Sequence, residues 1–218
     1  MNESFSQRAW KTIEPILERI KAHPFLCQMA DGTLSHERFM TYIRQDSIYL
    51  HANAEETAIL ADMLPDGELK DIFRKTAIES IQAEKDMQAM LGVRGDEIIK
   101  PMPATTGYLA HTRGILDSGD LAMSLAAMLP CQWVYDYIGR YILSIEKTPN
   151  PYHGWISCYT TEAMGRSTLL TIRLTDDLAL AQSPERRVQM LDAFVRSTQW
   201  EFDFWDQAYR AHADNDTL

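Results

Sequence analysis

The sequence predicts an all-α fold, a compact single-domain bundle of helices. Apolar and small residues recur every three or four positions through most of the chain, as in residues 67–91, a pattern typical of helices with one buried face. The strict alternation of apolar and polar residues that is typical of strands is absent from the sequence. The clusters ADGT, PDGE, DSGD and NPYHG are typical of turns. Together these features favour a helical bundle.

The helical pattern divides into eight segments along the chain. The longest break, GVRGDEIIKPMPATT (92–106), is predicted to be a loop inside the bundle, because the composition does not change across it. The last helix is predicted to begin with Ser183 as its N-cap and Pro184 at its first position. The predicted helices cover residues 6–22, 35–63, 67–91, 106–117, 120–146, 155–164, 168–181 and 184–211.

Length and charge limit the classes of function. A chain of 218 residues that is 45% hydrophobic is long enough for one domain, expected over residues 1–218 with its core at about 6–211. The formal net charge of −10 would repel phosphate backbones and anionic lipid. We therefore expect small molecules or proteins as partners, and neither nucleic acid nor membrane.

The N-terminal segment and the cysteines indicate the compartment. No long apolar run follows a basic leader, and no window approaches a membrane span, so a cytoplasmic protein is expected. The three cysteines, Cys27, Cys131 and Cys158, form no C-x-x-C pair, which disfavours a disulfide framework and a zinc knuckle. Each is expected to be a buried thiol, and Cys27 and Cys158 to be packing residues.

Two carboxylates fall on apolar helix faces. Positions three, four and seven residues away on a helix share a face, and by this test Asp46 has mostly aromatic and aliphatic neighbours, as has Glu201. A buried carboxylate has to be hydrogen-bonded, paired or held neutral. Such a group serves either a site or a network that ties helices together, and Glu56, with similar neighbours, shows that the pattern alone does not decide.

Cys131 follows a proline inside a predicted helix. Pro130 lacks an N–H group and crowds the carbonyl of Ala126, which predicts a bend or loosening just before the cysteine. Tyr135 lies one turn further on the same face, so a thiol and a phenol are expected to point inward together. A lone cysteine on an apolar face is also a common packing residue, and a nucleophilic role requires thiolate character from its surroundings.

Known metal, phosphate and hydrolase motifs are not found. None of the six histidines has a glutamate three residues before or after it, which disfavours a di-iron site, and we expect no metal. The sequence contains no phosphate-binding glycine-rich loop and no G-x-S-x-G motif. A haem or redox enzyme remains an alternative, with His23 as the candidate haem ligand.

Five separate stretches resemble one family when they are taken in order. HPFLCQMADGTLSHERFMTYIRQDSIYL (23–50), TTGYLAHT (105–112), AAMLPCQWVYDYIG (126–139), WISCYTTEAM (155–164) and STQWEFDFWDQAY (197–209) are similar to the thiaminase II (TenA) family. The resemblance implies a haem-oxygenase-like all-α fold without haem, assembled as a homotetramer. It also implies release of hydroxymethylpyrimidine from thiamin or from aminomethylpyrimidine, in thiamin salvage, with no metal or organic cofactor.

The resemblance also implies roles for individual residues. Cys131 would be the nucleophile that adds to the pyrimidine ring, as in the cysteine-containing branch of the family. Glu201 would bind and protonate a ring nitrogen, and Asp46 would hold the amidine edge of the ring. Four tyrosines would line or orient the pocket: Tyr49, Tyr108, Tyr135 and Tyr159.

Two points remain open from the sequence. Asn53 stands where family members commonly carry an aromatic residue, so a more polar pocket wall and a different preferred substrate are expected. The alternative to an enzyme is a regulatory or ligand-binding protein on the same fold, for which the charge of −10 disfavours direct contact with DNA.

Overall fold

The computed structural model describes residues 3–91 and 99–212. In these two ranges the chain forms nine α-helices and no β-strand. In chain order the helices are α1 (Phe5–Lys21), α2 (Pro24–Asp31), α3 (His36–Met63), α4 (Glu68–Leu91), α5 (Pro103–Leu116), α6 (Leu121–Ile145), α7 (His153–Cys158), α8 (Glu162–Leu180) and α9 (Pro184–Arg210). The all-α prediction is confirmed.

Side-chain caps set where many helices begin. Ser4 and Gln7 form a reciprocal capping box at the start of α1. The predicted cap at α9 is confirmed, because the Ser183 side chain accepts from the backbone N–H of Arg186 and Pro184 is the first helical residue. Such caps satisfy backbone N–H groups that the first helical turn leaves without a partner.

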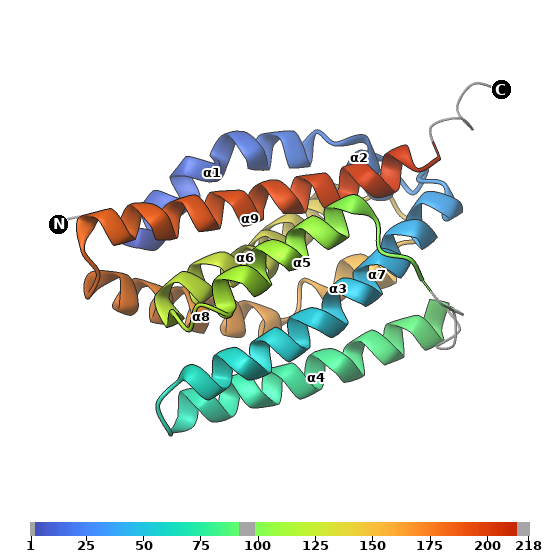
Figure 1. Cartoon of the computed structure of the whole chain (residues 1–218). Helices are drawn as coiled ribbons and strands as arrows, with labels where there is room; N and C mark the ends of the chain where they lie inside the picture. Colours follow the sequence, from blue (N-terminus) through green and yellow to red (C-terminus); the bar gives the residue numbers. More distant parts are fainter. Residues whose placement is uncertain (1–2, 92–98, 213–218) are drawn as a thin grey trace.

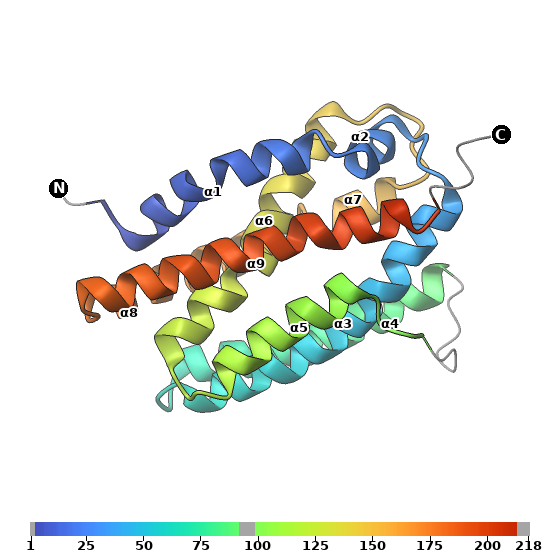
Figure 2. The same cartoon turned by 45° about the horizontal axis from the view of Figure 1, so that its top comes forward.

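Helix α9 runs through the middle of the bundle. It packs against α1, α3, α5 and α6, and its contact with α6 is among the most extensive in the molecule. Helices α3 and α4 form an antiparallel pair along one flank, which both views show (Figures 1 and 2). One apolar core lies around α9 and α6, and a smaller cluster that includes Leu60, Phe73 and Leu125 joins α3, α4 and α6.

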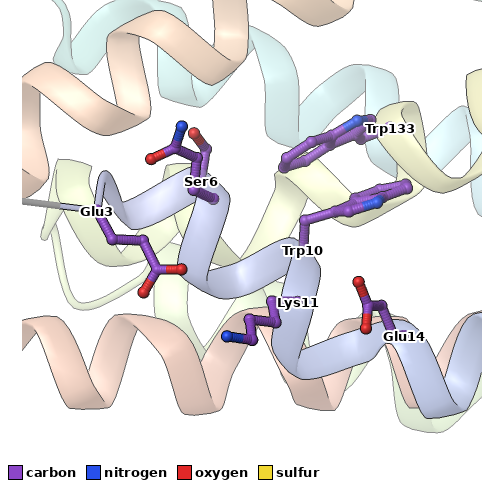
Figure 3. A pocket seen from close by; sticks show the side chains of 7 residues that line it. Glu3, Ser6, Trp10, Lys11, Glu14 and Trp133 are labelled. Atoms are coloured by element: carbon purple, nitrogen blue, oxygen red, sulfur yellow. The ribbon is translucent and has the colours of Figure 1, made fainter.

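Helix α6 presents different residues to its two sides. Trp133 stacks on Trp10 of α1, with ring centroids 4.4 Å apart, beside a surface hollow of about 370 Å³ (Figure 3). Cys131 lies two residues earlier, which is a rotation of roughly 200° on a helix, so it points away from that stack. The helix continues through Pro130 without interruption.

The structure differs from the predicted elements in three places. Residues Pro24–Asp31 form a helix that was not predicted. The helix predicted over 155–164 is wrong, because α7 ends at Cys158 and α8 begins at Glu162 with Thr161 as its N-cap. The predicted loop over 92–106 ends where α5 begins at Pro103, and its residues 92–98 lie outside the described part of the chain.

Within the described ranges, no helix has the combination of length and apolar composition that crossing a membrane requires.

Candidate active site

The candidate site is a cavity of about 420 Å³. It is bounded by α3, α4 and α6, by the end of α7 and by the first half of α8. Five of the seven predicted site residues line it: Asp46, Tyr49, Cys131, Tyr135 and Tyr159. They come from α3, α6 and the end of α7, so the fold brings together residues up to 113 positions apart (46 and 159). Asn53 lines the same cavity, so its polar side chain is part of the wall.

The other two predicted residues, Tyr108 and Glu201, are not among the lining residues. The Tyr108 hydroxyl donates a hydrogen bond of 2.6 Å to Oε1 of Glu201, and both side chains are buried. The Tyr108 ring lies 4.8 Å from the ring of Tyr49, which does line the cavity. Tyr108 of α5 and Glu201 of α9 therefore lie directly behind the part of the cavity wall that Tyr49 forms.

Burial raises the pKa of Glu201 to about 8. The hydrogen bond from Tyr108 acts in the opposite direction, because it stabilises the carboxylate, and the charge of Asp46 raises the pKa further. At neutral pH the Glu201 carboxyl group is therefore mostly protonated. A neutral acid beside a cavity is a group that can give a proton to a bound base.

Asp46 is buried on α3 and lines the cavity. Its negative charge raises the pKa of Tyr42, Tyr135 and Tyr159, and that of the Cys131 thiol. An ionised acid at this position can accept hydrogen bonds from a ligand that enters the cavity.

The Cys131 thiol lies among acidic groups. Burial raises its pKa well above the usual value, and the charge that Glu201 carries once it has ionised raises it further, as does the charge of Asp46. The neighbouring Tyr49 hydroxyl acts in the opposite direction and favours the thiolate. The resting residue is therefore a neutral thiol, and its proton has to leave during any reaction in which the sulfur acts as a nucleophile.

Tyr42, which the sequence did not single out as functional, does not line the cavity but forms a hydrogen bond with a residue that does. Its hydroxyl is 2.9 Å from the Tyr135 hydroxyl, both groups being buried. Tyr135 in turn packs on Tyr159 with ring centroids 4.9 Å apart. The available signal was the position of Tyr42 four residues before Asp46, which places both side chains on one face of α3.

Glu56 is buried but does not line the cavity. Burial raises its pKa to about 7, while a hydrogen bond with Thr112 and the charge of Arg113 act to lower it. Glu56 lies on α3 and both of these residues lie on α5, so its carboxyl group is consistent with a structural role in which it ties the two helices together.

Two of the expectations for cysteines are wrong. Cys27 and Cys158 are both exposed, so they are not buried packing residues. Cys27 lies in the short helix α2. Cys158 is the last residue of α7 and lines the cavity. Cys131 keeps part of its surface exposed, in keeping with its place in the cavity wall.

His23, the candidate haem ligand, uses both ring nitrogens within the protein. Nδ1 accepts from the backbone N–H of Phe25 and caps α2, and Nε2 lies 3.3 Å from Oδ1 of Asp206. Burial lowers the pKa of His23. This histidine therefore has a structural role. Among residues 3–91 and 99–212, no three His, Cys, Asp or Glu side chains gather in a way that could hold a metal ion.

Comparison with known proteins identifies the family and the fold. The model of the TENA/THI-4/PQQC family matches residues 10–211. The aminopyrimidine aminohydrolase of Bacillus subtilis (strain 168) is 30% identical over 201 residues, which cover 89% of this chain and 85% of that protein. The TenA homologue protein from P. horikoshii OT3 has a TM-score of 0.85 at 21% identity and covers 95% of this chain and 99% of its own.

A domain from Shewanella denitrificans OS217, described as having a heme oxygenase-like fold, has a TM-score of 0.73 at 15% identity, with 96% of this chain and 94% of that domain covered. The predicted haem-oxygenase-like fold is thereby confirmed. Because the family pattern extends over nearly all of the sequence, this chain belongs to the TENA/THI-4/PQQC family.

Proposed function

We propose that this protein is an aminopyrimidine aminohydrolase of the thiaminase II type. It releases hydroxymethylpyrimidine from aminomethylpyrimidine or from thiamin, so that the pyrimidine returns to thiamin synthesis. The name of the Bacillus subtilis relative supports this activity. The observation that carries the proposal is the buried, neutral Glu201 next to a cavity that contains the Cys131 thiol. A non-enzymatic regulator would have no need of this pairing.

Each polar group at the tyrosine-lined end of the cavity has a proposed role. Glu201 gives its proton to a ring nitrogen, and Tyr108 fixes the carboxyl group for that transfer. The Asp46 carboxylate accepts hydrogen bonds from the amino group on the amidine edge of the ring. Three aromatic side chains hold the ring between them: Tyr49, Tyr135 and Tyr159.

In the proposed first half of the reaction, the amine of the substrate is protonated and leaves the exocyclic methylene. Transfer of the Glu201 proton draws electron density from the ring, and the Cys131 sulfur then adds to a ring carbon while its proton passes to the amine of aminomethylpyrimidine. The carbon–nitrogen bond at the exocyclic methylene breaks, and ammonia leaves with the bonding pair. The methylene becomes conjugated with the ring nitrogen and carries positive character.

The second half restores every group. Water adds to the methylene and gives a proton to the Glu201 carboxylate, which is thereby neutral again. The sulfur then leaves the ring carbon and recovers a proton from the ring nitrogen, so aromaticity returns. The sum is aminomethylpyrimidine and water converted to hydroxymethylpyrimidine and ammonia. The proposed sequence needs no metal or organic cofactor.

The test is a chromatographic assay of hydroxymethylpyrimidine formed from aminomethylpyrimidine and, separately, from thiamin. Wild type is expected to turn over at least one substrate, and Cys131→Ser to lose that activity by about 10² or more, because serine is a poorer nucleophile at neutral pH. Cys27→Ser, which replaces an exposed thiol outside the cavity, is the matched control and should keep wild-type activity. An inert wild type, or an active Cys131→Ser, contradicts the proposal.

We also propose that the protein is a cytoplasmic homotetramer, as the family resemblance implies. Large apolar side chains on the surface support association, among them Ile78, which is 70% exposed, and Leu180, which is 75% exposed.

A further inference from the structure

The cavity extends well beyond the part that the pyrimidine ring would occupy. On α3 its lining runs from Asp46 to Leu60, a distance of about 20 Å along the helix axis. On α6 the lining runs from Leu125 to Tyr135, and Cys131 lies within this stripe. Cys131 therefore lies between two ends of the cavity. One end is lined by Asp46 and the tyrosines, and the second end lies toward Leu60 and Leu125.

A polar cluster on α6 and α8 lies next to Cys131 in the cavity wall, where the two ends meet, and α8 continues from this cluster toward the second end. Gln132 Nε2 donates to Oγ of Ser167 at 2.6 Å, and the Thr171 hydroxyl donates to Gln132 Oε1 at 3.0 Å. All three residues line the cavity. Ser167 and Thr171 are four residues apart, so α8 presents both to the same side.

The cluster keeps two donors that no described residue accepts. The Ser167 hydroxyl accepts from Gln132, but its own proton has no acceptor among residues 3–91 and 99–212. The amide of Gln132 has a second hydrogen, which is likewise without an acceptor in the described part of the chain. Two partly buried donors on one wall of a cavity are suited to an oxygen of a bound molecule.

The charges around the cavity disfavour an anion. Asp46 and Glu79 are acidic, and among the described lining residues none is Lys, Arg or His. Lys75, one turn from Glu79, pairs with it at 3.5 Å and does not line the cavity. A phosphate group placed here would lose hydration without gaining a cation, which is costly.

We propose that the Gln132–Ser167–Thr171 cluster, with the facing residues of α4, forms a second subsite that holds the group leaving the pyrimidine methylene. The subsite takes a neutral or cationic group that carries a hydroxyl or carbonyl oxygen, and it rejects phosphorylated groups. This inference rests on the proposed function, because it assigns the half of the cavity that the pyrimidine leaves open. The thiazolium of thiamin, with its positive charge and hydroxyethyl arm, has this chemistry, whereas the ammonia lost from aminomethylpyrimidine is too small to reach the cluster.

The test compares kcat/KM for thiamin with kcat/KM for aminomethylpyrimidine in each variant. Ser167→Ala is expected to lower the ratio about fivefold and Gln132→Leu about tenfold or more, since each removes a donor that only the larger substrate uses. A variant that is partly unfolded loses both activities together, so the ratio reports the subsite alone. Thr168→Val, which removes a buried hydroxyl on the same helix outside the cavity, is the matched control and should leave the ratio unchanged.

Thiamin monophosphate tests the selection against anions. Its kcat/KM with wild type is expected to be at least about tenfold below that of thiamin. An equal value, or an unchanged ratio in both cluster variants, overturns the subsite. A wild type that turns over aminomethylpyrimidine but neither cleaves thiamin nor is inhibited by it also overturns it. A wild type that is inert on both substrates contradicts the proposed function instead.

Discussion

At the scale of single residues, the proposed reaction depends on a carboxyl group that burial keeps neutral. In an unfolded chain Glu201 would ionise near its usual pKa of 4.5, whereas in the folded protein it keeps its proton up to about pH 8. Between these values the unfolded state binds fewer protons than the folded state, so stability falls as the pH rises. The acid that suits the proposed reaction therefore makes the fold less stable at neutral pH.

Replacing Glu201 by Gln should separate these two effects. The amide oxygen can still accept from Tyr108, and no charge has to be suppressed, so Glu201→Gln is expected to be more stable than wild type by on the order of 3 kcal/mol at pH 7. The gain should shrink toward pH 5. Activity should fall by about 10² or more, because an amide gives no proton. Urea unfolding at the two pH values and the product assay check this, and a less stable or fully active variant contradicts it.

Tyr108 should set the pH at which Glu201 loses its proton. The hydroxyl donates to the carboxylate, so Tyr108→Phe removes an interaction that lowers the pKa of Glu201. The variant is expected to keep its activity to higher pH than wild type, and to lose about 1 kcal/mol of stability for the missing hydrogen bond. The measurement is the pH profile of kcat for both proteins. A profile that moves to lower pH would exclude this role for the hydroxyl.

At the scale of elements, close approach between α6 and the end of α7 shapes the cavity wall. A Cβ added at Gly139 would lie 2.8 Å from Cβ of Tyr159, an atom that the backbone holds in place. Gly139→Ala should therefore push Tyr159 away from Tyr135, raise KM severalfold and cost about 1–3 kcal/mol of stability. Steady-state kinetics and thermal unfolding test this. Gly114→Ala on α5, where the added Cβ meets nothing, is the matched control.

Local patterns predicted the long helices well and the short ones poorly. A helix such as α3, with 28 residues, repeats its buried face many times, but α2 has eight residues and starts at a proline, so its periodicity is too short to stand out. The break between α7 and α8 lies at Tyr159, Thr160 and Thr161, where neither glycine nor proline marks a turn. The local signal there is Thr161, whose side chain accepts from the backbone N–H of Met164 and so starts a new helix.

The same limit applies to the site. Helical spacing identified Asp46, Glu201 and Cys131, because each stands out against apolar neighbours on its own helix. The contacts between helices could not be found in this way. The bond from Gln132 to Ser167 joins residues 35 positions apart, and the one from Tyr42 to Tyr135 spans 93 positions. The spacing of residues along one helix does not show which other helix, or which of its faces, those residues contact.

At the scale of the whole molecule, the proposed tetramer has a direct consequence for mass. Four copies of a 25.0 kDa chain should sediment as a species of roughly 100 kDa. The exposed Ile78 and Leu180 offer apolar surface for such contacts. Analytical ultracentrifugation over a range of protein concentrations tests this expectation, and a stable 25.0 kDa species at micromolar concentration would contradict it.

The most direct test of the account is the pH dependence of kcat for wild type with aminomethylpyrimidine, from pH 6 to about pH 9.5. Because kcat reports the enzyme–substrate complex, ionisation of the free substrate does not enter. The account predicts formation of hydroxymethylpyrimidine with a rate that falls at alkaline pH, as Glu201, whose pKa burial raises to about 8 in the free protein, loses its proton. A rate that stays level or rises through pH 9.5, or the absence of product at every pH, would contradict the claim that a neutral Glu201 begins the reaction.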